Sequence, residues 1–226
     1  MLKYKLTILS FLFLTMQCKL KGIDISYHNG DVDFSKIKSQ IDFVIMRAGY
    51  GDKIINSKEV KFDIYYEEAK KNNIPIGTYW YSYANTPEEA LVEAQTFLNK
   101  VKGKKFEYPV FYDVEEKSIL NQGKEIVSKI IKTFLEEVEK NGYLVGLYSS
   151  ASYLENLVDD EIKDKYIIWV AQWGKNIDKP RYNGKWDIWQ YSSKGHIDGV
   201  QSQNVDLDFS NKNFEEIVKE QGKNGY

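Results

Sequence analysis

Cysteine, proline and histidine are scarce in this sequence. Its 226 residues include one cysteine, four prolines and two histidines. Four prolines exclude a proline-rich linker protein, and 15 glycines exclude a collagen-like repeat. The two histidines, His28 and His196, do not form a metal-ligand pair by their spacing. A disulfide framework and a histidine metal centre are therefore not expected.

An excess of charge of one sign is also absent. The chain has 31 Lys and Arg against 33 Asp and Glu, a net charge of −2. This balance argues against a protein that binds nucleic acid by neutralising phosphates. The apolar fraction of 42% and the aromatic fraction of 15% exclude a disordered chain. The length suits one domain, which we expect to be a monomer.

Long hydrophobic runs are absent except near the N-terminus. Met1–Lys5 carries two lysines and no acid, and the largely apolar run Leu6–Met16 follows it. This run is about half of the ~20 residues that a membrane-spanning helix needs, so no stable membrane span is expected. The pattern predicts a secretory signal peptide over residues 1–18, followed by a single extracellular domain over residues 19–226.

Two alternatives remain for this N-terminal segment. It can be a buried N-terminal helix, although Lys19 and Lys21 bound the apolar run sharply. Alternatively, Cys18 can be the lipid-attachment cysteine of a bacterial lipoprotein, although the preceding residues Thr15–Gln17 lack the small side chains usual at such a site. Removal of residues 1–18 by signal cleavage would leave a chain without any thiol.

Strand-like runs recur through the rest of the chain. Several are rich in Val, Ile, Tyr and Trp with little polar interruption, as in strands that are buried on both faces. The runs are Gly22–Ser26, Ile41–Gly49, Ile74–Ala84, Tyr108–Glu115, Tyr143–Ser149, Tyr166–Trp173, Trp186–Tyr191 and Asn204–Asp208.

Helical patterns separate the early strands. They cover Ser57–Asn72, a helix that opens at the capping sequence Thr86–Glu89, and Glu125–Lys140. The last two strand-to-strand gaps have little room for a helix. The fold class predicted is therefore α/β, a barrel of eight strands and about five helices, (β/α)5(β)3. A doubly wound open sheet is the alternative, but no Gly-rich phosphate loop follows the first strand. The tail Gln221–Tyr226 is predicted to fray.

Four carboxylates lie at strand ends. In a parallel barrel the functional groups gather at the C-terminal ends of the strands. Asp24 ends the first strand, Asp113 and Glu115 end the fourth, and Asp206 lies in the eighth. These four acids are therefore expected to meet in one site.

Asp113 and Glu115 are two residues apart on a strand, so they should point to the same side, with carboxyls ~6–7 Å apart. Joint ionisation of such a pair is costly, so one member should hold its proton to higher pH. Glycoside hydrolysis uses such a pair, with one acid as proton donor and the other as stabiliser of the anomeric centre. A solvated strand end, a salt-bridged pair and a Mg²⁺ or Ca²⁺ site are the alternatives.

Aromatic side chains near the strand ends suit the faces of sugar rings. They are Tyr79, Tyr81, Tyr83, Tyr148, Trp173 and Tyr191. Packing in the core is the alternative role, and it is expected for Trp80 and Phe111. The residues expected to bind substrate are Tyr79, Tyr81, Tyr148, Gln172 and Trp173.

Seven stretches, in order, resemble the glycoside hydrolase family 25 muramidases, the lysozymes that cut peptidoglycan. They are Gly22–Ser26, Phe43–Gly51, Pro75–Tyr79, Pro109–Glu115, Trp169–Ala171, Trp189–Gly195 and Gly199–Leu207. The resemblance implies a barrel of eight strands and five helices. It also implies cleavage of the β-1,4 bond between N-acetylmuramic acid and N-acetylglucosamine, without metal or cofactor.

The resemblance also implies roles for the acids. Glu115 matches the general acid, and Asp113 matches the carboxylate that assists the anomeric centre, for example by orienting the substrate's 2-acetamido group. Asp24 and Asp206 match supporting acids at the rim, and Tyr79 and Tyr148 match positions in the sugar groove. Trp173 departs from the family, in which many members carry tyrosine.

Two rival functions remain at this stage. One is a carbohydrate-binding protein that uses the same barrel without catalysis, and retention of all four acids argues against it. The other is a barrel hydrolase that acts on a different acetamido polysaccharide such as chitin. Fold alone does not separate these functions.

Overall fold

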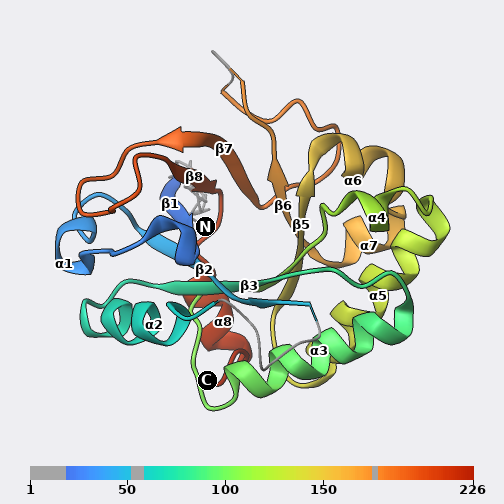
Figure 1. Cartoon of the computed structure of the whole chain (residues 1–226), viewed down its shortest axis with the longest axis horizontal. Helices are drawn as coiled ribbons and strands as arrows, with labels where there is room; N and C mark the ends of the chain where they lie inside the picture. The colour runs from blue at the N-terminus through green and yellow to red at the C-terminus, as the bar shows by residue number, and fades with distance from the viewer. Residues whose placement is uncertain (1–18, 52–58, 175–177) are drawn as a thin grey trace, which may run out of the picture.

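Eight strands close into a barrel in which each strand neighbours the next along the chain (Figure 1). The computed structural model describes residues 19–51, 59–174 and 178–226, so the predicted signal peptide lies outside the described residues. The strands are β1 (Leu20–Ile25), β2 (Phe43–Tyr50), β3 (Ile76–Tyr81), β4 (Val110–Asp113), β5 (Val145–Ser150), β6 (Ile167–Ala171), β7 (Ile188–Gly195) and β8 (Val205–Ser210). Each overlaps a predicted strand, so the predicted barrel is confirmed.

Strand β8 runs against the rest of the barrel. Strands β1 to β7 are parallel to one another, whereas β8 is antiparallel to both β7 and β1. The expectation of an all-parallel barrel was therefore wrong for this strand. Only residues 196–204 connect β7 to β8. A parallel connection needs a crossover of about a dozen residues or more, so this short connection forces the chain to turn back.

The described residues contain eight α-helices and one 3₁₀ helix rather than about five helices. They are η1 (Tyr27–Asn29), α1 (Phe34–Ile37), α2 (Phe62–Lys71), α3 (Pro87–Val101), α4 (Lys117–Leu120), α5 (Lys124–Lys140), α6 (Ala151–Leu157), α7 (Asp160–Lys165) and α8 (Phe214–Gln221). The three predicted helices correspond to α2, α3 and α5. Helices α1, α4, α6 and α7 have four to seven residues, too few to show a helical period in the sequence.

Helices α2, α3, α5, α6 and α7 lie along the β2–β6 side of the barrel, and none is drawn outside β7 and β8 (Figure 1). Local sequence sets the ends of these helices. Thr86 caps α3 by accepting a hydrogen bond from the Glu89 backbone N–H, and Pro87 occupies the first turn. Within the described residues, no helix is long and apolar enough to cross a membrane.

The interior of the barrel is filled by aromatic rings. Trp169 on β6 is 1% exposed, and its ring centroid lies 5.1 Å from that of Phe111, 4.5 Å from Tyr148 and 6.0 Å from Tyr79. Edge-to-face contacts of this kind stabilise a core beyond simple area burial. Trp169 therefore supports the floor of whatever site lies at this end of the barrel.

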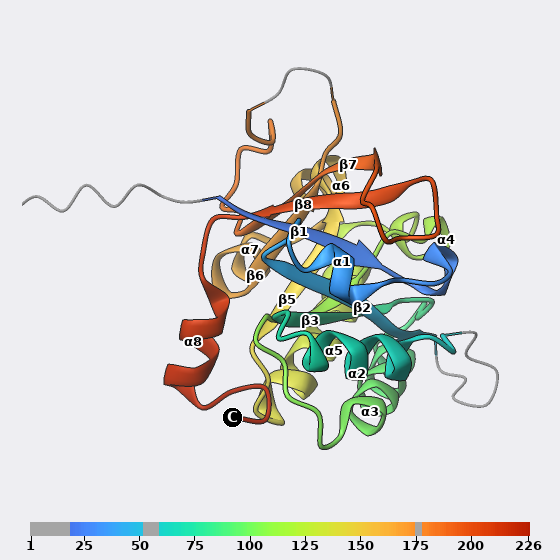
Figure 2. The same cartoon turned by 90° about the vertical axis from the view of Figure 1, so that its left-hand side faces the viewer.

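The C-terminal tail is bound to the barrel, so the prediction that it frays was wrong. Helix α8 lies at the end of the barrel where the parallel strands begin (Figure 2). Asn224, which follows it, is 0% exposed. Its side chain accepts from the Leu144 backbone N–H at 2.7 Å and donates to the Tyr108 carbonyl at 2.9 Å.

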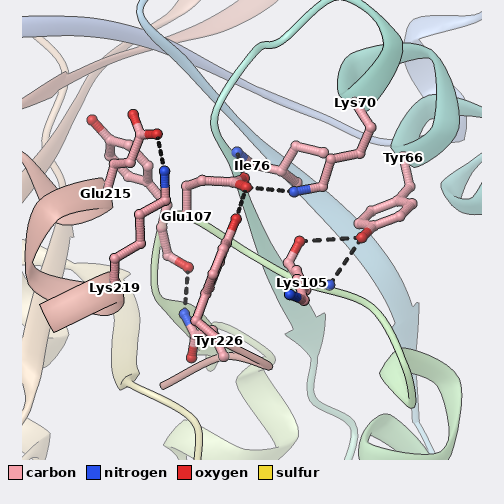
Figure 3. Close-up of polar contacts among 10 residues, drawn as sticks. Tyr66, Lys70, Ile76, Lys105, Glu107, Glu215, Lys219 and Tyr226 are labelled. Carbon is pink, nitrogen blue, oxygen red and sulfur yellow. Dashed lines mark hydrogen bonds and ion pairs between the residues drawn. The ribbon is translucent and has the colours of Figure 1, made fainter. Parts of the chain in front are cut away.

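The last residue of the chain is anchored separately. The Tyr226 hydroxyl donates to the Glu107 carboxylate, which also pairs with Lys70 Nζ at 2.5 Å and accepts from the Ile76 backbone N–H at 3.1 Å (Figure 3). The tail sequence is polar, and nothing in its periodicity indicates these partners. Its order depends on buried groups supplied by distant strands.

Replacement of the buried asparagine tests this anchor. Asn224→Ala leaves the Leu144 N–H and the Tyr108 carbonyl without their partner, at about 1–3 kcal/mol for each buried unsatisfied group. We expect the free energy of unfolding in urea to fall by about 2–4 kcal/mol. The exposed Gln221→Ala is the matched control and should change it by less than about 0.5 kcal/mol. Equal stability of the two variants would contradict the anchoring role.

Candidate active site

The four predicted acids line one cavity of about 310 Å³ at the end of the barrel. Its lining residues are Asp24, Ser26, His28, Asn29, Arg47, Tyr79, Tyr81, Asp113, Glu115, Tyr148, Trp169, Gln190, Ser193, Ser202, Asn204 and Asp206. The structure thus brings the four acids together, as the sequence led us to expect. Within the described residues, no group of His, Cys, Asp or Glu side chains is arranged to hold a metal ion.

Asp206 reaches this cavity by an unexpected route. It is the second residue of β8, and because β8 is antiparallel, its start lies beside the ends of the parallel strands. Asp206 pairs directly with Asp24 of β1 in the sheet register. The short β7–β8 connection therefore brings Asp206 to the cavity from the start of β8. In an all-parallel barrel, an acid at this edge would have to lie at the end of the last strand.

Asp113 and Glu115 occupy different depths of the cavity. Asp113 is the last residue of β4 and is 4% exposed, whereas Glu115 follows the strand and is exposed. Asp113 Oδ1 is buried and has no hydrogen-bond partner among the described residues. The pair therefore combines a carboxyl on the cavity wall with one at its mouth.

Both carboxyls hold protons more strongly than free acids. Burial, and then the charge of Glu115, raises the pKa of Asp113 well above its ordinary value, and Arg47 only partly opposes this. Desolvation, followed by the charges of Glu116 and Asp206, raises the pKa of Glu115. Without substrate, the stronger tendency to stay protonated therefore lies with Asp113. A solvated pair would lack the desolvation that is the largest cause of both shifts.

The amide of Gln190 links the cavity wall to Asp24. Gln190 is 3% exposed, and its Nε2 donates to Asp24 Oδ2 at 2.7 Å. Its Oε1 accepts from the Tyr148 hydroxyl and from Trp173 Nε1, both at 3.0 Å. Two donors on the oxygen fix which end of the amide faces Asp24. Gln190 belongs to a motif stretch, but its role follows only from these contacts.

The expected substrate-binding residues separate into three groups. Tyr79, Tyr81 and Tyr148 line the cavity, and the Tyr81 hydroxyl donates to Glu116 at 2.7 Å. Trp173 is 57% exposed at the rim and does not line the cavity itself. The side chain of Gln172 is directed elsewhere, because its Oε1 accepts from the Arg181 backbone N–H.

The remaining aromatics divide between rim and core. Tyr83 is 48% exposed and contacts the ring of Tyr81, with 5.2 Å between centroids. Tyr191 stacks on Phe209 at 4.4 Å and does not line the cavity, so its expected role at the sugar site was wrong. It follows Gln190 on β7, and alternation along a strand turns it to the opposite face. Trp80 is buried, as predicted.

A family model described as glycosyl hydrolases family 25 matches residues 23–200, which is more than half of the chain. The chain therefore belongs to glycosyl hydrolase family 25. This membership confirms the resemblance found in the sequence motifs.

Individual relatives agree with this assignment. The autolytic lysozyme of Clostridium acetobutylicum is 29% identical over 190 residues, which cover 84% of this chain and 55% of that protein. The modular autolysin LytC from Streptococcus pneumoniae, solved with a synthetic peptidoglycan ligand, has a TM-score of 0.72 at 29% identity. That match covers 84% of this chain and 46% of LytC. This chain thus spans about half the length of these two relatives.

A bacterial lysozyme from Streptomyces coelicolor shows the same fold over nearly its whole length. Its TM-score is 0.73 at 23% identity, with 86% of this chain and 93% of that chain covered. At this identity the likeness concerns the fold alone.

Proposed function

We propose that this protein is a lysozyme that hydrolyses the β-1,4 bond between N-acetylmuramic acid and N-acetylglucosamine in peptidoglycan. The observation that carries the proposal is the Asp113–Glu115 pair in one cavity walled by tyrosines, within a family 25 barrel. The pKa of Glu115 is raised, as a general acid that works near neutral pH requires. The co-structure of LytC with a peptidoglycan ligand supports the substrate class.

In the proposed mechanism, Glu115 protonates the leaving oxygen and Asp113 assists the anomeric centre as a carboxylate. The free protein favours the opposite proton placement, because Asp113 is buried and its Oδ1 lacks a donor. The N–H of the substrate's 2-acetamido group would donate to the Asp113 carboxyl and lower its pKa. Substrate binding would then leave Asp113 charged and the proton on Glu115, with the acetamido group oriented toward the anomeric carbon.

We propose the other cavity residues as supports for this reaction. Asp24 and Asp206 act at the rim, where burial raises the pKa of Asp206 to about 6. Tyr79, Tyr81 and Tyr148 present rings to the sugars, and Trp173 offers an exposed ring above Gln190. Such amphipathic rings bury apolar area while their polar tips stay hydrogen-bonded.

Digestion of purified peptidoglycan and of chitin, side by side, tests this function. The proposal predicts soluble fragments from peptidoglycan and none from chitin. Release from chitin would select the rival hydrolase. Binding to peptidoglycan without release would select the carbohydrate-binding protein.

We also propose that the protein is secreted after cleavage near residue 18. The support is the short apolar run that ends before Lys19 and Lys21. N-terminal sequencing of protein from the culture medium should begin within a few residues of Lys19. A diacylglyceryl mass on Cys18 would select the lipoprotein alternative, and a cytosolic protein that starts at Met1 would contradict both.

A further inference from the structure

One wall of the active-site cavity carries an arginine that the proposed reaction does not use. Arg47 of β2 lines the cavity, and its side chain is 11% exposed. Its Nη2 atom is buried and has no hydrogen-bond partner among residues 19–51, 59–174 and 178–226. A buried donor without an acceptor destabilises a folded protein, and an acceptor supplied by a ligand would remove this cost.

Neighbouring groups hold the guanidinium of Arg47 in place. Its Nε donates to Glu59 Oε2 at 2.5 Å, and the other carboxylate oxygen of Glu59 accepts from the Tyr27 backbone N–H at 2.9 Å. Arg47 Cζ also lies 5.1 Å from the ring centroid of Tyr27 and 5.6 Å from that of Tyr50. Because the guanidinium is planar, these contacts fix the direction of Nη2 before any ligand binds.

The four acids of the cavity do not pair with this cation. In the part of the chain that the structure describes, none of them forms an ion pair with a lysine, an arginine or a histidine. Burial raises the pKa of each of the four, so they tend to keep their protons and repel an anionic group less than four carboxylates would. The free donor of Arg47 therefore remains available to an oxygen of a ligand.

A histidine completes this side of the cavity. His28 follows Tyr27 in η1, directly after β1, and its ring centroid lies 3.9 Å from that of Tyr27. Desolvation, and then the charge of Arg47, lowers the pKa of His28, so this side chain is neutral at pH 7. Among the described residues that line the cavity, the permanent positive charge is therefore that of Arg47. Tyr27, His28 and Arg47 together form what we name the β1–β2 corner.

The two sugars of peptidoglycan differ in one group that suits an arginine. N-acetylglucosamine and N-acetylmuramic acid both carry hydroxyls and an acetamido group, but only the muramic acid carries a lactyl group on O3. This lactyl group ends in a carboxylate when it is free and in an amide carbonyl when it bears peptide. Both forms present acyl oxygens that accept hydrogen bonds from a guanidinium.

We propose that the β1–β2 corner binds the lactyl group of N-acetylmuramic acid, with Arg47 Nη2 donating to its acyl oxygen. The inference rests on the proposed function, because it names the group by which the same cavity distinguishes muramic acid from glucosamine. An N-acetylglucosamine in the same place leaves Nη2 unpaired, and sites built to bond a substrate group reject analogues that lack it. Arg47 is then the residue that excludes chitin.

Binding of single sugars tests this recognition without any hydrolysis. The probes are N-acetylmuramic acid, its methyl amide and N-acetylglucosamine, titrated into the full protein and followed by NMR chemical shifts. We expect N-acetylmuramic acid to bind about 10- to 100-fold more tightly than N-acetylglucosamine, as a charge-assisted hydrogen bond would give. The methyl amide should lie between them. Added salt should weaken binding of the carboxylate more than binding of the amide, because salt screens charge.

Arg47→Lys separates the free donor from the ion pair. The lysine can still pair with Glu59, so this buried acid keeps a counter-charge, but its ammonium lacks the planar fork that directs Nη2. The preference for N-acetylmuramic acid should fall to within about threefold, while the affinity for N-acetylglucosamine stays at the wild-type level. Arg181→Lys is the matched control. Arg181 is exposed and does not line the cavity, so this variant should keep the wild-type preference.

Each outcome decides the proposal. Equal binding of the two sugars by the wild type, or binding of neither, would overturn it even if Arg47→Lys failed to fold. A preference that survives in Arg47→Lys would overturn the role of this arginine, whereas a preference lost there and kept in Arg181→Lys would support it. The proposed function is tested separately. A protein that shows the preference but releases nothing from peptidoglycan would support the β1–β2 corner and contradict the lysozyme.

Discussion

Glu115→Gln is expected to fold normally and to lose about 10²- to 10⁴-fold in kcat, the usual contribution of a proton donor. The amide keeps the shape of the side chain but has no acidic proton to give to the leaving oxygen. Because the pKa of Glu115 is raised in the folded protein, the free energy of unfolding of the wild type falls as pH rises above the ordinary glutamate pKa. Thermal stability of the variant at neutral pH should therefore hold or increase.

The adjacent Glu116→Gln provides a matched control. Glu116 accepts from the Tyr81 hydroxyl and does not line the cavity. Its charge contributes to the raised pKa of Glu115, so its removal should move the alkaline limb of the pH–rate profile to lower pH. Turnover near the optimum should largely persist. Substantial turnover by Glu115→Gln would assign the proton donor to another residue.

Asp113→Asn is expected to lower the plateau of the pH–rate profile by about 10²- to 10³-fold, the range seen when a stabilising group aimed at the reacting centre is lost. The asparagine cannot become the carboxylate that the anomeric centre and the acetamido N–H require. Burial raises the pKa of Asp113, so the wild type loses stability as pH rises above about 4. The variant lacks this loss and should be more stable than the wild type at neutral pH.

Two results would contradict this assignment of Asp113. If the residue only tuned Glu115, the variant would show a shifted pH limb and a plateau like that of the wild type. If it attacked the sugar directly, a glycosyl ester would be trapped on Asp113. The separation of ~6–7 Å predicted from the strand rise is wider than the ~5–5.5 Å of enzymes with an attacking carboxylate.

Much of the barrel could be predicted from the sequence because its strands are buried on both faces. Runs such as Phe43–Tyr50 and Ile167–Ala171 are almost uninterrupted in apolar and aromatic residues, which local pattern reading detects. Strand direction is a different matter. The reversal of β8 depends on the length of its connection to β7, and in the sequence that length indicates only that a helix has little room there.

The candidate site was predicted in part for the same reason. Asp24 and Asp113 end apolar strands, and such acids are visible as polar interruptions. Asp206 was predicted correctly although the direction expected for β8 was wrong. The register with β1 places the start of β8 beside Asp24, at the edge where the parallel strands end. Strand alternation places Gln190 and Tyr191 on opposite faces of β7, but it does not indicate that Gln190 is the one that faces the cavity.

Long-range hydrogen bonds account for most of what the sequence did not predict. Asn224 reads as part of a polar tail, yet it bonds to backbone groups of Tyr108 and Leu144, at sequence separations of 116 and 80 residues. Likewise Asp208 looks in the sequence like one more acid at a strand end, yet it is 0% exposed and accepts a hydrogen bond from the Trp169 indole. No local periodicity encodes such partners.

A mass spectrum of the new reducing ends, after digestion of purified peptidoglycan, tests the central claim most directly. Hydrolysis of the proposed bond by this protein predicts fragments that end in reducible N-acetylmuramic acid, and the Glu115→Gln protein should release them about 10²- to 10⁴-fold more slowly. New reducing ends on N-acetylglucosamine, or identical spectra with and without the protein, would contradict the account.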